Sequence, residues 1–111
     1  MAKTSQAAVS DRVDEMVRRI VERFGPEQII LFGSHARGAA EPESDVDLLV
    51  VMPVEGSKRE KQLEVRLALH DIRGPKDIIV TRPDEFEWRR EIVGTIEHVC
   101  ALEGKVLYAR L

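Results

Sequence analysis

Three short apolar runs limit what this chain can fold into. Residues 28–32 read QIILF, residues 45–51 read DVDLLVV and residues 77–81 read DIIVT, and glycine and proline turns lie between them. Runs of this length and composition are typical of buried strands. We therefore predict three core strands, and a fourth strand at a sheet edge over residues 105–108.

Amphipathic helical patterns separate these runs. Apolar residues recur at helical spacing over residues 10–24, where Ser10 is a favourable N-cap. A capping-box pattern at Ser57 opens a second helix over residues 57–72, and a third helix is expected over residues 83–103. Because strands and helices alternate, the sequence predicts an α/β or α+β fold.

Length, charge and cysteine usage narrow the function classes. The chain has 111 residues, which suits one compact domain, and we place it at residues 10–111 after a flexible start at residues 1–9. The formal net charge is −3, which argues against nucleic-acid binding through a basic surface. The sequence shows neither a signal-peptide pattern nor an apolar run of the roughly 20 residues that span a bilayer. Cys100 has no partner for an internal disulfide, so we expect a cytoplasmic protein without membrane contact.

Two carboxylates begin the second predicted strand. Asp45 and Asp47 flank Val46, and side chains two apart on a strand point to the same face. Carboxylates about 7 Å apart repel each other, and a divalent cation removes that repulsion. Oxygen ligands of this kind suit Mg²⁺, which binds carboxylates together with substrate phosphates. The plainer alternative is that both aspartates simply face water.

A glycine–serine pair follows the first predicted strand. Gly33 allows a sharp turn and a close approach to the backbone, and Ser34 adds a hydroxyl donor. Backbone N–H groups of a short helical turn after them would bind anionic oxygens, and Arg37 could bind phosphate. We expect at most one helical turn in residues 35–44, where His35 is interpreted as a loop residue. A plain turn with a solvated arginine is the alternative.

A third carboxylate, Asp77, begins the third predicted strand. If this strand lies beside the one that carries Asp45 and Asp47, all three carboxylates converge. One of them could then take a proton from a hydroxyl nucleophile. Two divalent ions held about 3.5–4 Å apart would stabilise the attacking and leaving oxygens of a phosphoryl displacement. Crowded carboxylates should also raise the pKa of at least one of them.

Taken together, Gly33-Ser34, the Arg37-Gly38 pair and the Asp45-Val46-Asp47 motif, followed by a strand with Asp77, resemble the minimal nucleotidyltransferases of the polymerase β superfamily. Within that superfamily the chain is most similar to the MNT antitoxins that accompany HEPN ribonuclease toxins. The resemblance extends from the strand at residues 29–32 to residues 103–108. It implies a short mixed β-sheet backed by helices.

The resemblance also implies roles for the motif residues. Gly33 and Ser34 would hold the triphosphate of a nucleotide, and Arg37 would lie near the phosphates or the acceptor. Asp45 and Asp47 would hold two metal ions. Asp77 would complete the first metal site and help to deprotonate the acceptor hydroxyl.

The activity implied by the resemblance is a metal-dependent transfer of a nucleoside monophosphate, AMP from ATP, to an acceptor hydroxyl. The acceptor would be a tyrosine of a HEPN toxin, and a second chain would supply the other wall of the acceptor site. Two other functions fit the same residues. The chain could be a non-catalytic module that binds nucleotide or toxin, or a nucleotidyltransferase that acts on a small-molecule alcohol.

Overall fold

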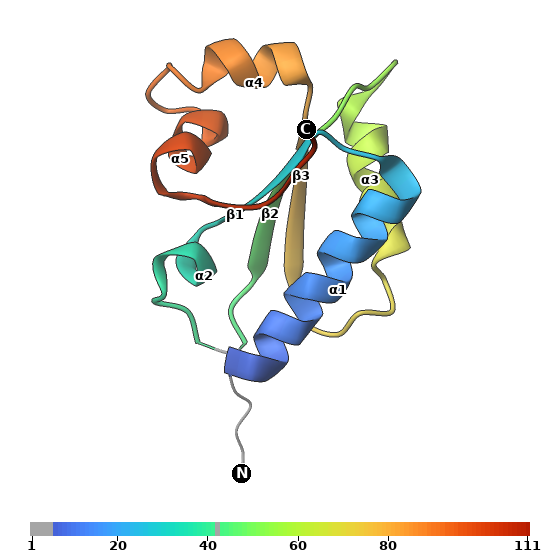
Figure 1. The fold of residues 1–111 in the computed structure, drawn as a ribbon, viewed down its shortest axis with the longest axis vertical. Coiled ribbons are helices and arrows are strands. Elements are labelled where there is room, and N and C mark those ends of the chain that lie inside the picture. The colour runs from blue at the N-terminus through green and yellow to red at the C-terminus, as the bar shows by residue number, and fades with distance from the viewer. Residues whose placement is uncertain (1–5, 42) are drawn as a thin grey trace.

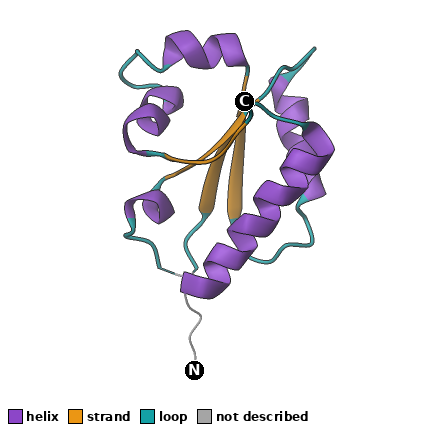
Figure 2. Cartoon of the chain, in the orientation of Figure 1, coloured by secondary structure: helices purple, strands orange, loops and turns teal. Residues whose placement is uncertain are grey.

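A computed structural model describes residues 6–41 and 43–111. Its described elements, in chain order, are α1 (Gln6–Phe24), β1 (Gln28–Phe32), α2 (Ser34–Arg37), β2 (Val46–Val51), α3 (Lys58–Ala68), β3 (Lys76–Thr81), α4 (Pro83–Arg89), α5 (Ile96–Glu103) and β4 (Lys105–Ala109). The α/β expectation is confirmed (Figure 2).

The four strands form one mixed sheet in the order β3-β2-β1-β4. β1 pairs antiparallel with both β2 and β4, whereas β2 and β3 run parallel. A parallel pair needs a crossover connection, and α3 provides it. The predicted edge position of the last strand is therefore confirmed, and β3 forms the opposite edge.

Helices cover both faces of the sheet (Figure 1). On one face, α1 and α3 pack on alternate strand residues, among which Ile29, Leu48 and Val50 are buried. On the other face, α4 and α5 pack on the intervening residues, such as Ile30 and Leu49. Because side chains alternate along each strand, Asp47 lies on the α4–α5 face, two residues before Leu49.

The first helix begins earlier than expected. The sequence predicts a start at Ser10, but α1 already begins at Gln6 and buries Val9 against the core. Of the expected flexible start, residues 1–5 lie outside the described residues, and residues 6–9 belong to α1. Tertiary packing of Val9 extends the helix beyond the favourable cap that the sequence suggested.

The predicted helix over residues 83–103 is wrong, because the structure has two helices there. Residues 90–95 separate α4 from α5, and Gly94 within them has a positive φ of 101°. Thr95 then caps α5, since its hydroxyl accepts a hydrogen bond from the His98 N–H at 3.0 Å. A left-handed glycine followed by an N-cap threonine is a helix-break signal that the apolar spacing concealed.

The helix predicted over residues 57–72 opens as expected and ends early. The Ser57 hydroxyl accepts a hydrogen bond from the Glu60 N–H at 3.1 Å, which confirms this cap. However, α3 ends at Ala68, and residues 69–72 form turns that still bury Leu69 and Ile72. Apolar periodicity continued through the turns because their side chains enter the same core. In the described part of the chain, no helix has the length and apolar character needed to cross a membrane.

Candidate active site

The bend after β1 brings the chain backbone against a carboxylate. Gly33 has φ 76° and ψ −158°, and α2 begins at the next residue, Ser34. The Gly33 carbonyl accepts hydrogen bonds from the N–H groups of Ala36 at 3.1 Å and Arg37 at 3.2 Å. A Cβ atom at Gly33 would overlap the side chain of Asp47. The residues 34–37 thus form the single helical turn that the sequence allowed, and glycine is required before it.

Asp47 and Asp77 are register partners in the parallel pair β2–β3. Paired residues on adjacent strands point to the same face, with strands about 4.8 Å apart. On its other side, Asp47 faces Phe32 of β1, the residue that precedes Gly33. Three neighbouring strands therefore bring the bend, Asp47 and Asp77 to one end of one sheet face.

Asp45 lies just outside this strand pair. It precedes the first residue of β2, and its side chain is exposed, whereas Val46 is fully buried on the opposite face. Asp47 is half-buried. The alternation expected for Asp45, Val46 and Asp47 is therefore present, although Asp45 itself belongs to the loop.

The carboxylates act on each other electrostatically. Burial raises the pKa of Asp47, and the charges of Asp77 and Asp45 raise it further. The nearby His35 and Arg37 lower the pKa of Asp47 through their charges, but their effect is smaller. The expectation that crowding raises the pKa of at least one carboxylate is confirmed. A cation placed among these oxygens would relieve both the repulsion and the cost of burying the charge.

Two arginines lie at the margins of this group. The guanidinium of Arg66, on α3, is 3.6 Å from a carboxylate oxygen of Asp77. The guanidinium of Arg37 is 3.7 Å from the carboxylate of Glu103 at the end of α5. Arg37 was expected to bind phosphate, and in this structure it pairs with Glu103. Arg66 drew no attention in the sequence, because one arginine on an amphipathic helix carries no signal of what it faces.

His35 fixes the loop that leads to Asp45. Its Nε2 is 3.0 Å from the carbonyl oxygen of Ser44, the residue before Asp45. The Ser44 hydroxyl in turn accepts a hydrogen bond from the Glu41 N–H at 3.1 Å. We interpret His35 from the sequence as a loop residue, and the structure shows that it contacts the residue before Asp45 and so acts as a positioning residue.

The carboxylates do not by themselves form a complete metal-binding site in the described part of the chain. Among the described residues, no group of three or more His, Cys, Asp and Glu side chains is arranged to hold a metal ion. What the structure brings together is the pair Asp47 and Asp77, with Asp45 beside it. Their oxygens are hard ligands of the kind that Mg²⁺ prefers, and Mg²⁺ takes only one or two carboxylates when phosphates complete its shell. The donor set therefore fits Mg²⁺ bound together with a phosphate ligand.

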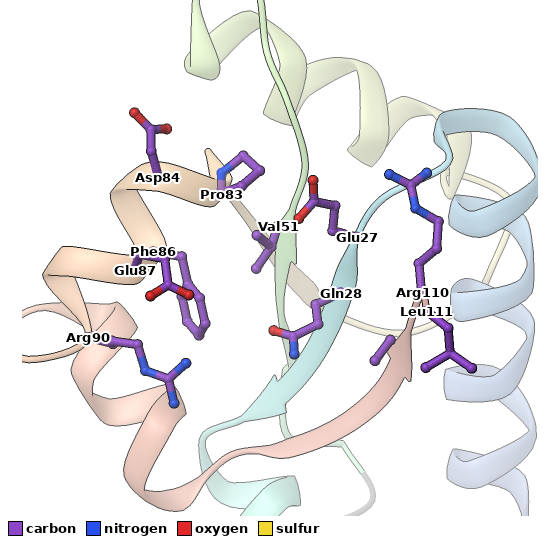
Figure 3. A pocket seen from close by; sticks show the side chains of 11 residues that line it. Glu27, Gln28, Val51, Pro83, Asp84, Phe86, Glu87, Arg90, Arg110 and Leu111 are labelled. Atoms are coloured by element: carbon purple, nitrogen blue, oxygen red, sulfur yellow. The ribbon is translucent and has the colours of Figure 1, made fainter.

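A larger cavity lies at the other end of the sheet. It has a volume of about 570 Å³, and Figure 3 shows Phe86 of α4 facing Gln28 of β1 across it. Gln28 pairs with Val51, four residues along β2 from Asp47, which is about 13 Å. This cavity is separate from the carboxylates.

Comparison with known proteins assigns the family. The family model described as nucleotidyltransferase domain matches residues 13–99. This match includes the bend, both strands with aspartates and the α3 crossover between them. The chain therefore belongs to the nucleotidyltransferase domain family, as the sequence motifs predicted.

A short stretch of the chain also matches a curated relative. It is 51% identical over 41 residues to MJ1305 of Methanocaldococcus jannaschii, which is provisionally named a protein adenylyltransferase. The match covers 35% of this chain and 28% of the relative, so the chain spans less than a third of that protein's length.

Two solved structures share the fold. A provisionally named nucleotidyltransferase from Sulfolobus solfataricus superposes with a TM-score of 0.69 at 23% identity, over 99% of this chain and 93% of that one. A toxin–antitoxin complex with AMP-PNP contains a chain that superposes with a TM-score of 0.52 at 18% identity, over 90% of this chain and 73% of that one. At these identities the likeness concerns the fold.

Proposed function

We propose that this chain is a metal-dependent adenylyltransferase that moves AMP from ATP to a tyrosine hydroxyl of a partner protein, a HEPN ribonuclease toxin, and so acts as its antitoxin in the cytoplasm. The observation that carries the proposal is the parallel register of Asp47 and Asp77 beside the Gly33–Ser34 bend. The provisional name of the curated relative and the toxin–antitoxin complex of similar fold support the choice of acceptor.

Each residue has a distinct role in this proposal. The bend at Gly33 and Ser34 holds the triphosphate, because the α2 turn offers backbone N–H groups and a hydroxyl. Asp45 and Asp47 hold the cations, which we take to be two Mg²⁺ ions. When bound, they neutralise phosphate charge and stabilise the attacking and leaving oxygens. His35 keeps the loop before Asp45 in place.

Asp77 is the base in the transfer step. It accepts the proton of the acceptor hydroxyl while a bond forms between that oxygen and the α-phosphorus of ATP. The bond from this phosphorus to the bridging oxygen of the β-phosphate breaks, and pyrophosphate leaves. Asp77 suits this role because it occupies the edge strand β3, where its side chain is half exposed.

A direct labelling experiment tests the proposal. We expect the wild-type chain with Mg²⁺ and ATP labelled at the α-phosphate to label a cognate HEPN toxin, and Asp47→Asn or Asp77→Asn to lower labelling by about 100-fold or more. Asp14→Asn, an exposed carboxylate on α1, is the matched control and should label like wild type. Equal labelling by all four proteins would reject the assignment of these carboxylates.

A module that binds the toxin without turnover is a second candidate, because the same fold could cover the toxin whether or not its carboxylates hold a cation. Inhibition by occlusion would survive the loss of Asp45, Asp47 and Asp77. Measuring toxin neutralisation by the three Asp→Asn variants at equal expression separates the two functions. Full neutralisation by all three variants would favour the binding module.

A further inference from the structure

A groove of about 390 Å³ adjoins the carboxylates on the outer side of β3. Its α3 wall carries Arg59, Gln62, Leu63 and Arg66, and its other wall is formed by Asp77 and Ile78 of β3. Figure 1 shows α3 alongside this edge of the sheet. Asp77 therefore lies between the groove and the interior of the site.

The order of these features across the sheet assigns a side to each reactant. The bend at Gly33 follows β1, Asp47 is on β2, and Asp77 is on the edge strand β3. In phosphoryl transfer the attacking and leaving oxygens lie in line on opposite sides of the phosphorus. If the leaving pyrophosphate is held at the bend, the attacking hydroxyl must approach from the β3 side, where the groove opens.

The α3 wall has the chemistry to hold a polypeptide. Arg59, Leu63 and Arg66 are spaced i, i+4 and i+7, so they share one helix face about 10 Å long. Leu63 is 55% exposed although it is apolar. Within the described residues Arg59 has no ion-pair partner, and the only one of Arg66 is Asp77. Glu60 is the single acidic residue on this wall.

A side chain fixes this wall relative to the strand. The Gln62 side-chain oxygen accepts a hydrogen bond from the Val80 backbone N–H at 2.9 Å. This bond uses an outward-facing N–H of the edge strand and ties α3 to β3 through the middle of the groove wall. The stretch of α3 that carries Arg59 and Arg66 is thus tied to the strand that carries Asp77.

We propose that this groove holds the acceptor segment of the partner protein, and that the segment carries acidic residues on both sides of its tyrosine. The inference rests on the proposed function and adds what the acceptor must look like. The tyrosine hydroxyl lies at Asp77, a neighbouring apolar side chain packs on Leu63, and flanking carboxylates pair with Arg59 and Arg66.

Peptide binding tests the inference separately from catalysis. The probes are three fluorescein-labelled peptides of equal length, each with one tyrosine and one leucine, flanked by glutamates, by serines or by lysines. Fluorescence anisotropy with the whole chain should show the glutamate peptide binding about tenfold more tightly than the lysine peptide, as two exposed charge contacts allow.

A charge reversal makes the test specific. Arg59→Glu touches none of the carboxylates and should reverse the preference toward the lysine peptide. Arg110→Glu is the control, because Arg110 lines the larger cavity at the far end of the sheet, and it should leave the preference unchanged. No binding, equal binding of all three peptides, or a preference that Arg59→Glu does not alter would overturn the inference.

The two proposals fail in different ways. If the chain labels the toxin but the peptides show no charge preference, the groove assignment is wrong and the transferase stands. If the peptides behave as expected but no toxin is labelled, the docking groove stands and the transferase proposal fails.

Discussion

At the scale of single residues, Gly33 meets two requirements at one α-carbon. Its positive φ of 76° is a conformation that L side chains rarely adopt, and its missing Cβ makes room for the Asp47 carboxylate. Either requirement alone would favour glycine. Both together make this position a steric link between the bend and the carboxylates.

Gly33→Ala should therefore lower both stability and activity. Gly33 has ψ −158° as well as a positive φ, a region that is essentially restricted to glycine. We expect a loss of about 1–3 kcal/mol in the free energy of unfolding from this backbone conformation alone, with a further loss from the overlap with Asp47. Gly38→Ala is the control for a positive φ without a steric contact, since Gly38 has φ 73° and ψ 17° and open space where the Cβ would lie. Urea unfolding compares the two variants, and equal losses would show that the Asp47 contact is unimportant.

Asp47 is expected to lower stability when no cation is bound. Its pKa is raised in the folded chain by burial and by Asp77 and Asp45. The folded state therefore binds this proton more tightly than the unfolded state does. The resulting loss of stability is absent below the pKa of Asp47 in the unfolded chain. It develops as the pH rises toward the pKa of Asp47 in the folded chain and is fully present above that pKa.

Asp47→Asn should accordingly melt at a higher temperature than wild type at pH 7 without Mg²⁺. The difference in melting temperature should shrink as the pH falls toward the ordinary aspartate pKa of about 4, because the Asp47 carboxyl group of wild type then becomes neutral, as the amide of the variant is. Thermal melts over this pH range in a chelating buffer measure it. A variant that melts below wild type at pH 7 would contradict the electrostatic account of the site.

At the scale of elements, the sequence was most informative where a strand carried its own boundary signals. Gly33 after residues 28–32 and the aspartates before apolar runs placed β1, β2 and β3 within one residue of their observed starts. The pairing of Asp47 with Asp77 was only conditional in the sequence, because strand order depends on contacts between distant segments. Arg66 and His35 could not be assigned for the same reason, since their partners lie 11 and 9 residues away.

Helix ends were harder to predict than strands. Apolar spacing over residues 83–103 suggested one helix, yet Ile92 and Val93 are exposed and lie in the break between α4 and α5. The buried carboxylate of Glu97 was also missed, although it accepts a hydrogen bond from the Thr81 hydroxyl at 2.8 Å and ties α5 to β3. A glutamate on a helix gives no sequence signal of such burial.

Thr95 should be the residue that sets the start of α5. Its hydroxyl caps the helix and also donates to the Arg89 carbonyl at 2.8 Å, at the end of α4. We expect Thr95→Ala to cost about 1 kcal/mol of unfolding free energy and Thr95→Ser to cost much less. Chemical denaturation of both variants measures this. Equal effects would mean that the methyl group, rather than the hydroxyl, matters.

At the scale of the whole molecule, the site depends on the assembled sheet, because its residues lie on β2 and β3, in the bend after β1 and in the loop before β2. A ligand that binds only this assembly stabilises it by mass action. At a concentration of 100 times the Kd, the stabilisation is about 2.7 kcal/mol.

Mg²⁺ with a non-hydrolysable ATP analogue should therefore raise the melting temperature by several degrees, and either component alone should do less. Asp47→Asn should lose the joint effect, while Arg110→Glu, at the far end of the sheet, should keep it. If Mg²⁺ and the ATP analogue together leave the melting temperature of wild type unchanged, this result would count against nucleotide binding at this site.

The parallel pairing of β2 with β3 also determines which length changes the gene can tolerate. Extra residues in the crossover loops leave the hydrogen bonds between β2 and β3 intact, because the entropic cost of closing a loop rises only slowly with its length. Deleting one residue inside β3, between Asp77 and the buried Val80, would shift Asp77 by one step and turn its carboxylate to the opposite face. Insertions in this family should therefore gather around α3, and the strand beginnings should keep their spacing.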